Sequence, residues 1–318
     1  MLTLLQESAA MAIVNVFETG SVQGDYGSVT LLPGDTGHLT FGRSQTTLAA
    51  GGKAGLLATL LTDYCAAPDA RFTRLLNPYL PRSAKPDLTL DNDTRFQNIL
   101  RATADDPVMR SIQDQFFEQR YWDRAVNSAT AIGIATALGI ATVYDSTVHG
   151  SWELVRDMTN VGLGGDVSSI GEQAWIQGYV TTRRSWLANH SNVLLHATVY
   201  RMDALQSLVD LNLWDLAMPF EVRGHEISTL SLQATPPRCY TGPAPGSRDL
   251  AVQTPLLRGL DVRLLQLGLS ESGCKVVADG VFGQGSLQAL AQYRTQPGLP
   301  AAAGADAGLV AKLAASVT

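Results

Sequence analysis

The sequence is poor in cysteine, in basic charge and in long hydrophobic runs, and each shortage excludes a class of protein. Among 318 residues there are three cysteines, Cys65, Cys239 and Cys274. Their odd number and wide spacing leave no legible disulfide framework or Cys-x-x-Cys metal site, so we expect buried or free thiols. The net charge of −6 and the isoelectric point near 5.3 argue against a nucleic-acid partner, because such proteins present a basic face.

No stretch is long enough to cross a membrane as a helix. The most apolar run, residues 129–144, has about 16 residues, fewer than the roughly 20 that a spanning helix needs. It is rich in Ala, Gly and Thr, and we interpret residues 128–148 as one central buried helix. The first residues lack the basic segment that opens a signal peptide. We therefore expect that a role outside the producing cell would need another export route, or that the chain is a piece of a larger protein.

What the sequence does contain is typical of a folded, mostly helical protein of two domains. Hydrophobic residues make up 45% and charged residues 16% of the chain, which excludes a disordered protein. Apolar residues recur at helical spacing over residues 2–17, 54–64, 94–102, 107–125, 151–159, 169–188 and 193–212. Two short strand-like segments, at 29–32 and 38–41, are separated by turn residues and predict a hairpin. The expected fold class is mainly α (α+β).

A change in composition marks the expected domain boundary. The stretch from Ala234 to Ser247 has four prolines and two glycines, which cannot continue a helix and indicate a semi-rigid linker. We therefore predict a first domain at 1–232, a linker at 233–247 and a second domain at 248–318.

The last segment resembles the small three-helix peptidoglycan-binding domain found at the ends of bacterial cell-wall hydrolases. The similarity rests on the stretches 257–266, 278–283 and 286–293, in which helix spacing and turn glycines agree. Phe282 is expected to pack between the helices. The resemblance implies binding to peptidoglycan glycan strands, and a three-helix bundle without a ligand remains the alternative.

The stretch 17–47 holds two carboxylates in a pattern that suggests acid–base chemistry. Glu18 ends the first apolar helix, where a carboxylate opposes the helix dipole and contributes nothing structurally. Asp35 lies in the Gly-flanked turn of the hairpin. Asp25 is a rival of Asp35 for the role of the base, and Asp35 could also be only a turn former.

Residues 1–232 resemble glycoside hydrolase family 46, the chitosanases of the lysozyme superfamily. The matching blocks, in order, are Phe17–Gly20, Tyr26-Gly27, Asp35 with Thr40 and Gly42, Tyr144-Asp145, Arg183 eight residues after Trp175, and Arg201–Asp203. The resemblance implies a lysozyme-superfamily helical domain with a small β-sheet at the cleft.

The same resemblance assigns roles to these residues. Glu18 would be the general acid, Asp35 the general base and Thr40 the residue that orients the water. Asp145, Arg183 and Arg201 would form a buried network behind the acid, since a buried arginine without a carboxylate is costly. Inverting glycoside hydrolysis needs such a pair of carboxyl groups, roughly 6.5–9.5 Å apart with a water between them.

One departure from the chitosanases bears on the substrate. The family carries an aspartate, understood to bind a glucosamine ammonium, where this chain has Gly52 or Lys53. A lysine repels an ammonium and suits a substrate with carboxylates, such as the lactyl-peptide of N-acetylmuramic acid. The expected substrate contacts are Tyr26, Arg43 and Lys53. Together with the wall-binding resemblance of residues 248–318, the lysine leads us to predict a muramidase. A chitosanase and a non-catalytic wall-binding protein are the alternatives.

The expected setting follows from the same reasoning. No cofactor or metal is predicted, because no metal-ligand spacing links the histidines. A wall hydrolase without a signal peptide is typical of phage endolysins and of antibacterial toxins delivered by contact-dependent systems such as type VI secretion. It would act in the periplasm or cell wall of a target cell, as a monomer, and a toxin would have an immunity protein as a partner.

Overall fold

A computed structural model of the chain describes residues 2–31, 36–43, 45–296 and 298–318, and the chain folds into two compact units. The first consists of Met1–Gly24 and Phe117–Ala234, and the second of Asp25–Phe116 and Thr235–Thr318. The units divide the chain differently from the three consecutive segments expected, because the C-terminal residues pack with 25–116. No helix of the described residues is long and apolar enough to span a bilayer.

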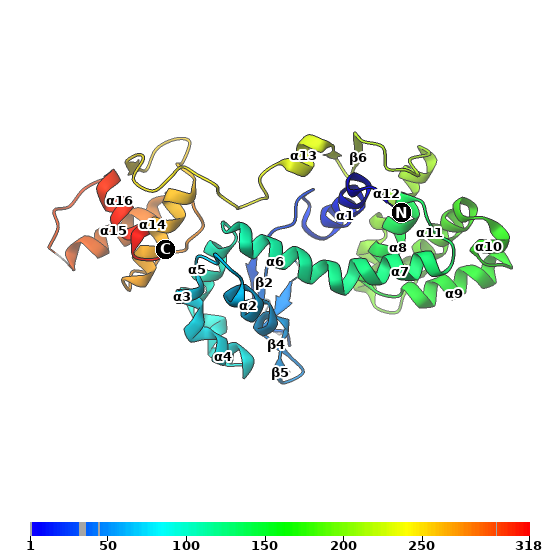
Figure 1. The fold of residues 1–318 in the computed structure, drawn as a ribbon, viewed down its shortest axis with the longest axis horizontal. Coiled ribbons are helices and arrows are strands. Elements are labelled where there is room, and N and C mark those ends of the chain that lie inside the picture. Colours follow the sequence, from blue (N-terminus) through cyan, green and yellow to red (C-terminus); the bar gives the residue numbers. More distant parts are fainter. Residues whose placement is uncertain (1, 32–35, 44, 297) are drawn as a thin grey trace. The chain divides into compact units, whose positions relative to one another are not determined.

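The first unit is helical apart from one hairpin (Figure 1). In chain order it contains α1 (Leu4–Thr19), the π-helix η3 (Glu118–Trp122), α7 (Asp123–Ala131), α8 (Ala137–His149), α9 (Trp152–Leu163), α10 (Val167–Ile170), α11 (Glu172–Ala188), the 3-10 helix η4 (Val193–Thr198), α12 (Tyr200–Asp210), β6 (Phe220–Val222), β7 (His225–Ile227) and α13 (Thr229–Gln233).

The core of this unit forms around α8. Its residues 137–146 are all buried, and α1, α7, α9, α11 and α12 pack against it. The single helix predicted over 128–148 is wrong. The chain breaks after Ala131, Gly133 adopts a positive φ of 90°, and α8 begins anew where Thr136 caps the N–H of Gly139 at 3.1 Å. Only glycine adopts that φ at little cost, and the new cap restores an acceptor for the first turn.

The second unit combines short strands with helices. Its elements are β1 (Val29–Thr30), β2 (Thr40–Phe41), β3 (Thr46–Thr47), β4 (Ala49–Ala50), β5 (Lys53–Ala54), α2 (Leu56–Ala66), α3 (Thr73–Leu76), η1 (Asn77–Tyr79), α4 (Leu80–Ala84), η2 (Leu88–Asn92), α5 (Thr94–Thr103), α6 (Pro107–Phe117), β8 (Leu250–Ala251), α14 (Leu260–Glu271), α15 (Gln284–Thr295), β9 (Gly304–Ala305) and α16 (Ala307–Ala315).

The predicted hairpin is present and gains a third strand. β1 pairs antiparallel with β2, with Val29 opposite Phe41, and β2 pairs with β3, with Thr40 opposite Thr47. A second hairpin, β4–β5, places Ala50 opposite Lys53. The fold is mainly helical with few small sheets, as the sequence predicted.

The helices α14, α15 and α16 (orange to red in Figure 1) pack into a bundle whose core contains Phe282 at 0% exposure, as expected. This bundle also shares a core with the rest of its unit. Leu264 and Leu267 of α14 lie in one apolar cluster with Phe96 and Ile99 of α5. Residues 248–318 are therefore packed against the segment 25–116 through a continuous hydrophobic core.

Buried polar groups reinforce the packing of α5 against α14. The fully buried amide of Asn98 donates to Ser270 Oγ at 3.1 Å and to the Val276 carbonyl at 2.8 Å, and it accepts from the Ala278 N–H at 2.9 Å. Buried polar groups destabilise a fold unless such partners are present. Asn98 thus fixes the register of the bundle on α5.

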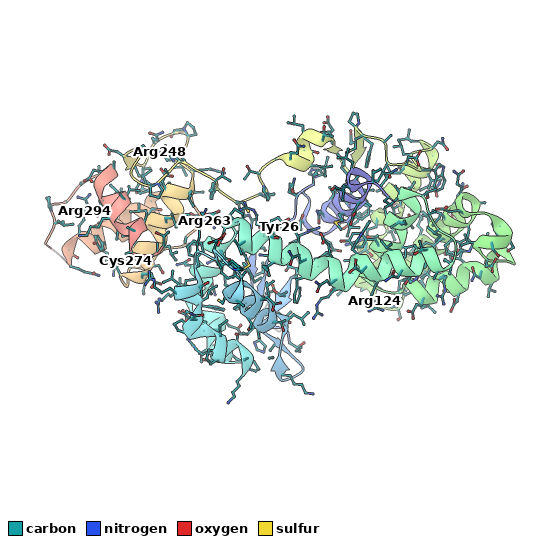
Figure 2. The ribbon with its side chains drawn as sticks, viewed as in Figure 1. Tyr26, Arg124, Arg248, Arg263, Cys274 and Arg294 are labelled. Atoms are coloured by element: carbon teal, nitrogen blue, oxygen red, sulfur yellow. The ribbon has the colours of Figure 1, made fainter. Side chains whose placement is uncertain are left out.

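A buried ion pair lies beside Asn98. Arg263 projects from α14 (Figure 2), and its Nε lies 3.0 Å from Asp105 Oδ2, with both side chains at most 2% exposed. Its Nη1 donates to the carbonyl of Arg101 at 2.8 Å, and Asp105 also accepts from the N–H of Tyr240 at 2.7 Å. Burial raises the pKa of Asp105 to about 6, against the influence of Arg263. The pair ties three separate segments of the unit together.

Replacing Arg263 with methionine should loosen both sides of this contact. The change leaves Asp105 buried without its cation, which costs about 3–5 kcal/mol of unfolding free energy. We expect a lower urea midpoint by circular dichroism and faster hydrogen exchange in peptides of both α5 and α14. The control is Arg156→Met, whose pair with Asp157 is exposed and contributes about 0–1 kcal/mol. Equal effects of the two substitutions would contradict the assignment.

Candidate active site

Glu18 occupies the last turn of α1. The helix begins with a capping box between Thr3 and Gln6 and ends at Gly20, whose φ of 66° lets its N–H return to the Val16 carbonyl. This left-handed end is the usual glycine C-cap. The preceding residue, Phe17, is buried in the core, whereas the Glu18 side chain is 39% exposed. The helix therefore holds Glu18 rigidly at the edge of the core with its carboxylate accessible.

Arg201 of α12 joins Glu18 to a buried carboxylate. Its Nη2 donates to Glu18 Oε1 at 2.6 Å and its Nη1 to Asp145 Oδ1 at 2.7 Å. Arg201 is 4% exposed and Asp145, on α8, is 0% exposed. Burial alone would lower the Arg201 pKa, but the charges of Asp145 and Glu18 outweigh it and raise the pKa. The guanidinium thus stays charged and fixes the position of Glu18.

Two aromatic rings hold the guanidinium from the side. The Arg201 Cζ lies 5.5 Å from the ring centre of Phe17 and 5.9 Å from that of Tyr200. The Tyr200 hydroxyl in turn donates to the Phe17 carbonyl at 2.8 Å. Arginine over an aromatic face gains cation–π attraction where water is excluded. The end of α1 and the start of α12 are therefore locked together around the charge.

Arg183 forms a second layer behind this pair. Its Nη1 donates to the Gly150 carbonyl at 3.0 Å and its Nη2 lies 3.1 Å from His149 Nδ1. Within the described part of the chain, no hydrogen bond joins Arg183 directly to Asp145 or Arg201. The sequence predicted one network of Asp145, Arg183 and Arg201. In the structure Asp145 pairs directly with Arg201, and Arg183 contacts His149 and Gly150 at the end of α8.

His149 is the residue of this network that the sequence did not reveal. Since a guanidinium only donates, Nδ1 of His149 must accept and is unprotonated. Burial, followed by the charge of Arg201, lowers the pKa of His149 to about 4, so the ring is neutral near pH 7. Its spacing of four residues from Asp145 on α8 was the available signal, because such residues share one helix face.

The predicted general base is Asp35, with Asp25 as its rival. Asp35 lies outside the described residues. Its rival Asp25 is engaged elsewhere, with Oδ2 3.2 Å from Arg238 Nη1 and Oδ1 accepting from the Gly27 N–H at 3.2 Å. The predicted water-orienting Thr40 lies on β2, and its hydroxyl is within 3.3 Å of the Thr30 carbonyl. The roles of Asp35 and Thr40 stay predictions.

The three predicted substrate contacts fall into two kinds. Tyr26 and Arg43 are 6% and 8% exposed, and Asp114 accepts from both, at 2.7 Å from the Tyr26 hydroxyl. Their polar ends are therefore held by Asp114, whose side chain is 33% exposed, and their role as substrate contacts stays a prediction. Lys53 is exposed on the β4–β5 hairpin, and no ion pair involves it among the residues that the structure describes.

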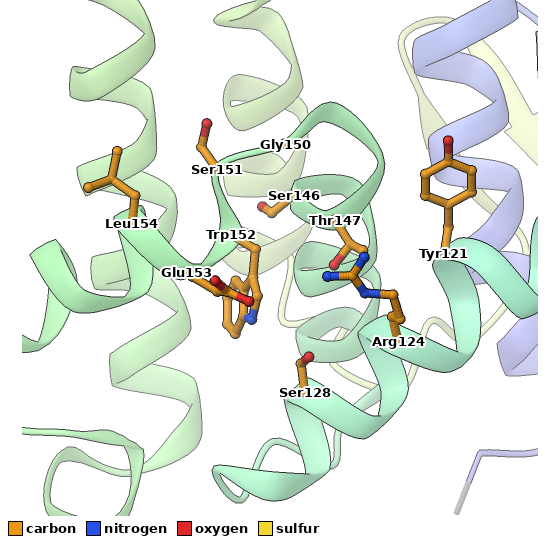
Figure 3. Close-up of a pocket in the computed structure, with 10 residues that line it drawn as sticks. All are labelled: Tyr121, Arg124, Ser128, Ser146, Thr147, Gly150, Ser151, Trp152, Glu153 and Leu154. Atoms are coloured by element: carbon orange, nitrogen blue, oxygen red, sulfur yellow. The ribbon is translucent and has the colours of Figure 1, made fainter. Parts of the chain in front are cut away.

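A pocket of about 380 Å³ is present in the first unit (Figure 3). It is lined by Tyr121, Arg124 and Ser128, by Ser146 and Thr147 of α8, and by residues 150–154. None of the predicted site residues lines it. Among the described residues there is also no cluster of His, Cys, Asp or Glu that could hold a metal ion. The cysteines are free thiols, and two of them are buried.

The comparisons with known proteins identify the class to which this helical fold belongs. The model of glycosyl hydrolase family 46 matches residues 12–220. The chain belongs to this family. A search of curated proteins finds no match.

Solved structures of the family have the same fold. A native chitosanase from Bacillus subtilis MY002 is 26% identical, with a TM-score of 0.57 over 70% of this chain and 96% of its own. A mutant of a Bacillus subtilis MY002 chitosanase complexed with six glucosamine units is 25% identical, with a TM-score of 0.57 over 72% and 98%. The family 46 chitosanase of Gynuella sunshinyii, complexed with chitotetraose, is 21% identical, with a TM-score of 0.56 over 71% and 98%.

Replacing Arg201 with methionine should remove both stability and activity. Asp145 would remain buried without a cation, at a cost of about 3–5 kcal/mol, and Glu18 would lose its anchor. Arg201→Lys keeps the charge but not the two-pronged guanidinium, so it should recover more stability than activity. Urea unfolding and glycan hydrolysis measure the two effects.

The matched control is Arg184→Met. Arg184 pairs with Asp203 at 2.6 Å, but both side chains are 52% exposed, so the change should cost at most about 1 kcal/mol. If Arg201→Met were as mild as this control, the buried pair would not be what holds Glu18.

Proposed function

We propose that this glycoside hydrolase cleaves peptidoglycan as a muramidase, with Glu18 as its general acid. The observation that carries the catalytic part is the buried Arg201–Asp145 pair that fixes Glu18 at the accessible end of α1. A structural role does not require so costly an arrangement, because apolar side chains could fill the same volume.

The chemistry follows the inverting scheme. Protonated Glu18 donates its proton to the glycosidic oxygen as the C1–O bond breaks, and Asp35 takes a proton from the water that attacks C1 from the opposite face. Arg201, charged and immobile, holds the Glu18 carboxylate in place after the proton has left. Asp35 then releases its proton to solvent and Glu18 takes one up, which returns the enzyme to its starting state.

Lys53 supports peptidoglycan as the substrate. It stands exposed on the β4–β5 hairpin, where the resemblance to chitosanases expects an amine-binding aspartate at this position or at Gly52. A cation there repels glucosamine and attracts the carboxylates of muramic acid and its peptide. The similarity of residues 248–318 to a wall-binding module points to the same substrate.

A chitosanase is the second candidate, because the similar solved structures are named chitosanases and two contain chitosan fragments or glucosamine units. Specificity for chitosan is a property of those proteins, and one fold commonly supports more than one activity. The products distinguish the candidates directly.

The setting completes the proposal. The enzyme would act as a monomer on the wall of a target cell, delivered as an endolysin or as an injected antibacterial toxin. An injected toxin would require an immunity protein in the producing cell.

Replacing Glu18 with glutamine should abolish cleavage of purified sacculi. Loss of one acid or base typically costs about 10²–10⁴ in rate, and Asp35→Asn should have an effect of similar size. Mass spectrometry of the fragments that the unsubstituted enzyme releases should show saccharides ending in reducing N-acetylmuramic acid. Asp25→Asn is the matched control and should stay active, since Asp25 is paired with Arg238. Activity on chitosan but not on sacculi would overturn the proposal.

Replacing Lys53 with aspartate should shift the substrate preference toward chitosan. A carboxylate on the hairpin would attract ammonium groups and repel muramyl carboxylates, and one such contact changes a rate ratio by about tenfold. The ratio of initial rates on chitosan and on sacculi measures the shift. Lys85→Asp makes the same charge change at another exposed position of this unit and should leave the ratio unchanged.

A further inference from the structure

The β6–β7 hairpin of the first unit has a fixed position on α1. Its inward residues Phe220, Val222 and Ile227 are at most 7% exposed, and they lie in the same apolar cluster as Phe17 of α1. Strand β7 also packs directly against α1. The turn that joins the two strands is therefore carried by a well-anchored element.

This turn holds an arginine in an unfavourable backbone conformation. Val222 pairs with His225, so the loop consists of Arg223 and Gly224, whose φ angles are 53° and 80°. Two-residue hairpin loops with both φ angles positive favour Asn-Gly, Asp-Gly or Gly-Gly, because few other residues tolerate the left-handed region at the first position. Strain of this kind often accompanies a functional side chain.

The Arg223 side chain lies over an aromatic ring. Its Cζ is 3.6 Å from the ring centre of Tyr200. Among the described residues Arg223 has no ion pair and its side chain makes no hydrogen bond, although the hairpin itself carries Glu221 and Glu226. A planar guanidinium stacked on a ring is attracted to it and restrains its movement. The contact with Tyr200 is therefore the interaction that this side chain provides.

Tyr200 connects Arg223 to the end of α1. Its hydroxyl donates to the Phe17 carbonyl at 2.8 Å, one of the last-turn carbonyls that find no donor inside a helix. Its ring lies edge-on to that of Phe17, with centroids 6.0 Å apart, and 5.9 Å from the Cζ of Arg201. Tyr200 thus contacts both the residue before Glu18 and the arginine that holds the Glu18 carboxylate.

We propose that Arg223 is a positioning residue for Glu18 and acts through Tyr200. The stacked guanidinium keeps the Tyr200 ring in one place, and the ring keeps the last turn of α1 and Arg201 in register. Glu18 then meets the glycosidic oxygen in a single orientation. A displacement of about 1 Å at a reacting group can lower a rate by about 10². The inference rests on the proposed role of Glu18 as the acid and adds no contact with the substrate.

The substitution Arg223→Asn distinguishes this role from a merely structural one. Asparagine adopts the positive φ of this turn more readily than arginine does, so the urea midpoint should not fall. On solubilised glycan strands kcat should fall about tenfold with KM unchanged, because the acid is misplaced while the substrate contacts remain. Arg223→Lys keeps a cation over the ring and should recover part of kcat.

Three results of this experiment would overturn the proposal. An unchanged kcat would show that the stacking does not matter for the reaction. A rise in KM in place of the fall in kcat would make Arg223 a substrate contact. An unfolding midpoint that falls in step with kcat would make its role structural.

The matched control is Arg238→Asn. Arg238 also has a positive φ, of 60°, but its side chain is 70% exposed and pairs with Asp25 at 3.2 Å. The same substitution at this position should leave kcat and KM unchanged. A loss as large as that of Arg223→Asn would be a general effect of replacing such an arginine and would count against the proposal.

A second substitution, Tyr200→Phe, tests the route through the ring. Phenylalanine keeps the aromatic face beneath Arg223 but loses the hydroxyl that bonds to the Phe17 carbonyl. We expect a similar fall in kcat, and the double variant should be little slower than either single variant, because both changes act on one contact. Losses that multiply would contradict a route through Tyr200.

Hydrogen exchange gives a readout that does not depend on the reaction. In Arg223→Asn the amides of residues 17–20 should exchange faster, while those of α8 stay protected. Faster exchange there, without any glycan cleavage by the unsubstituted enzyme, would reject the proposed function and keep the positioning contact. Cleavage of sacculi with exchange and kcat unchanged in Arg223→Asn would reject the positioning contact and keep the function.

Discussion

The buried guanidinium of Arg201 is the constraint on which the catalytic unit depends. It has lost its water, so it needs two carboxylates within hydrogen-bond reach, and Asp145 and Glu18 supply them at 2.7 and 2.6 Å. Meeting that need brings the end of α1, the middle of α8 and the start of α12 to one point. Under the proposed mechanism one contact serves both stability and catalysis, because Glu18, which helps to neutralise the arginine, is also the proposed proton donor.

A second buried arginine organises the other unit by the same physics. Arg263 pairs with Asp105 and donates hydrogen bonds to backbone carbonyls from separate segments. These contacts hold the C-terminal bundle on α5. The bundle is thereby a part of the second unit.

The sequence predicted most of the helices, because apolar periodicity and caps are local properties. The prediction was wrong where the apolar pattern continues past a point at which the helix ends. The run of Ala, Gly and Thr over 128–148 gave no sign of the break at Gly133, and the β6–β7 hairpin lies in a segment for which no element was predicted. Asp114 accepts from both Tyr26 and Arg43, across 88 and 71 residues of sequence, and no local pattern reveals such a pairing.

The sequence by itself determined that Glu18 ends a helix, that a small sheet follows, and that residues 248–318 form helices. Only the tertiary structure decided which groups surround Glu18, since Asp145 and Arg201 are separated by 56 residues and Glu18 and Arg201 by 183. It also decided that His149 supports Arg183 and that the C-terminal helices pack on α5. Helices form through neighbouring residues, whereas buried charges select partners by burial and distance, wherever the chain brings them.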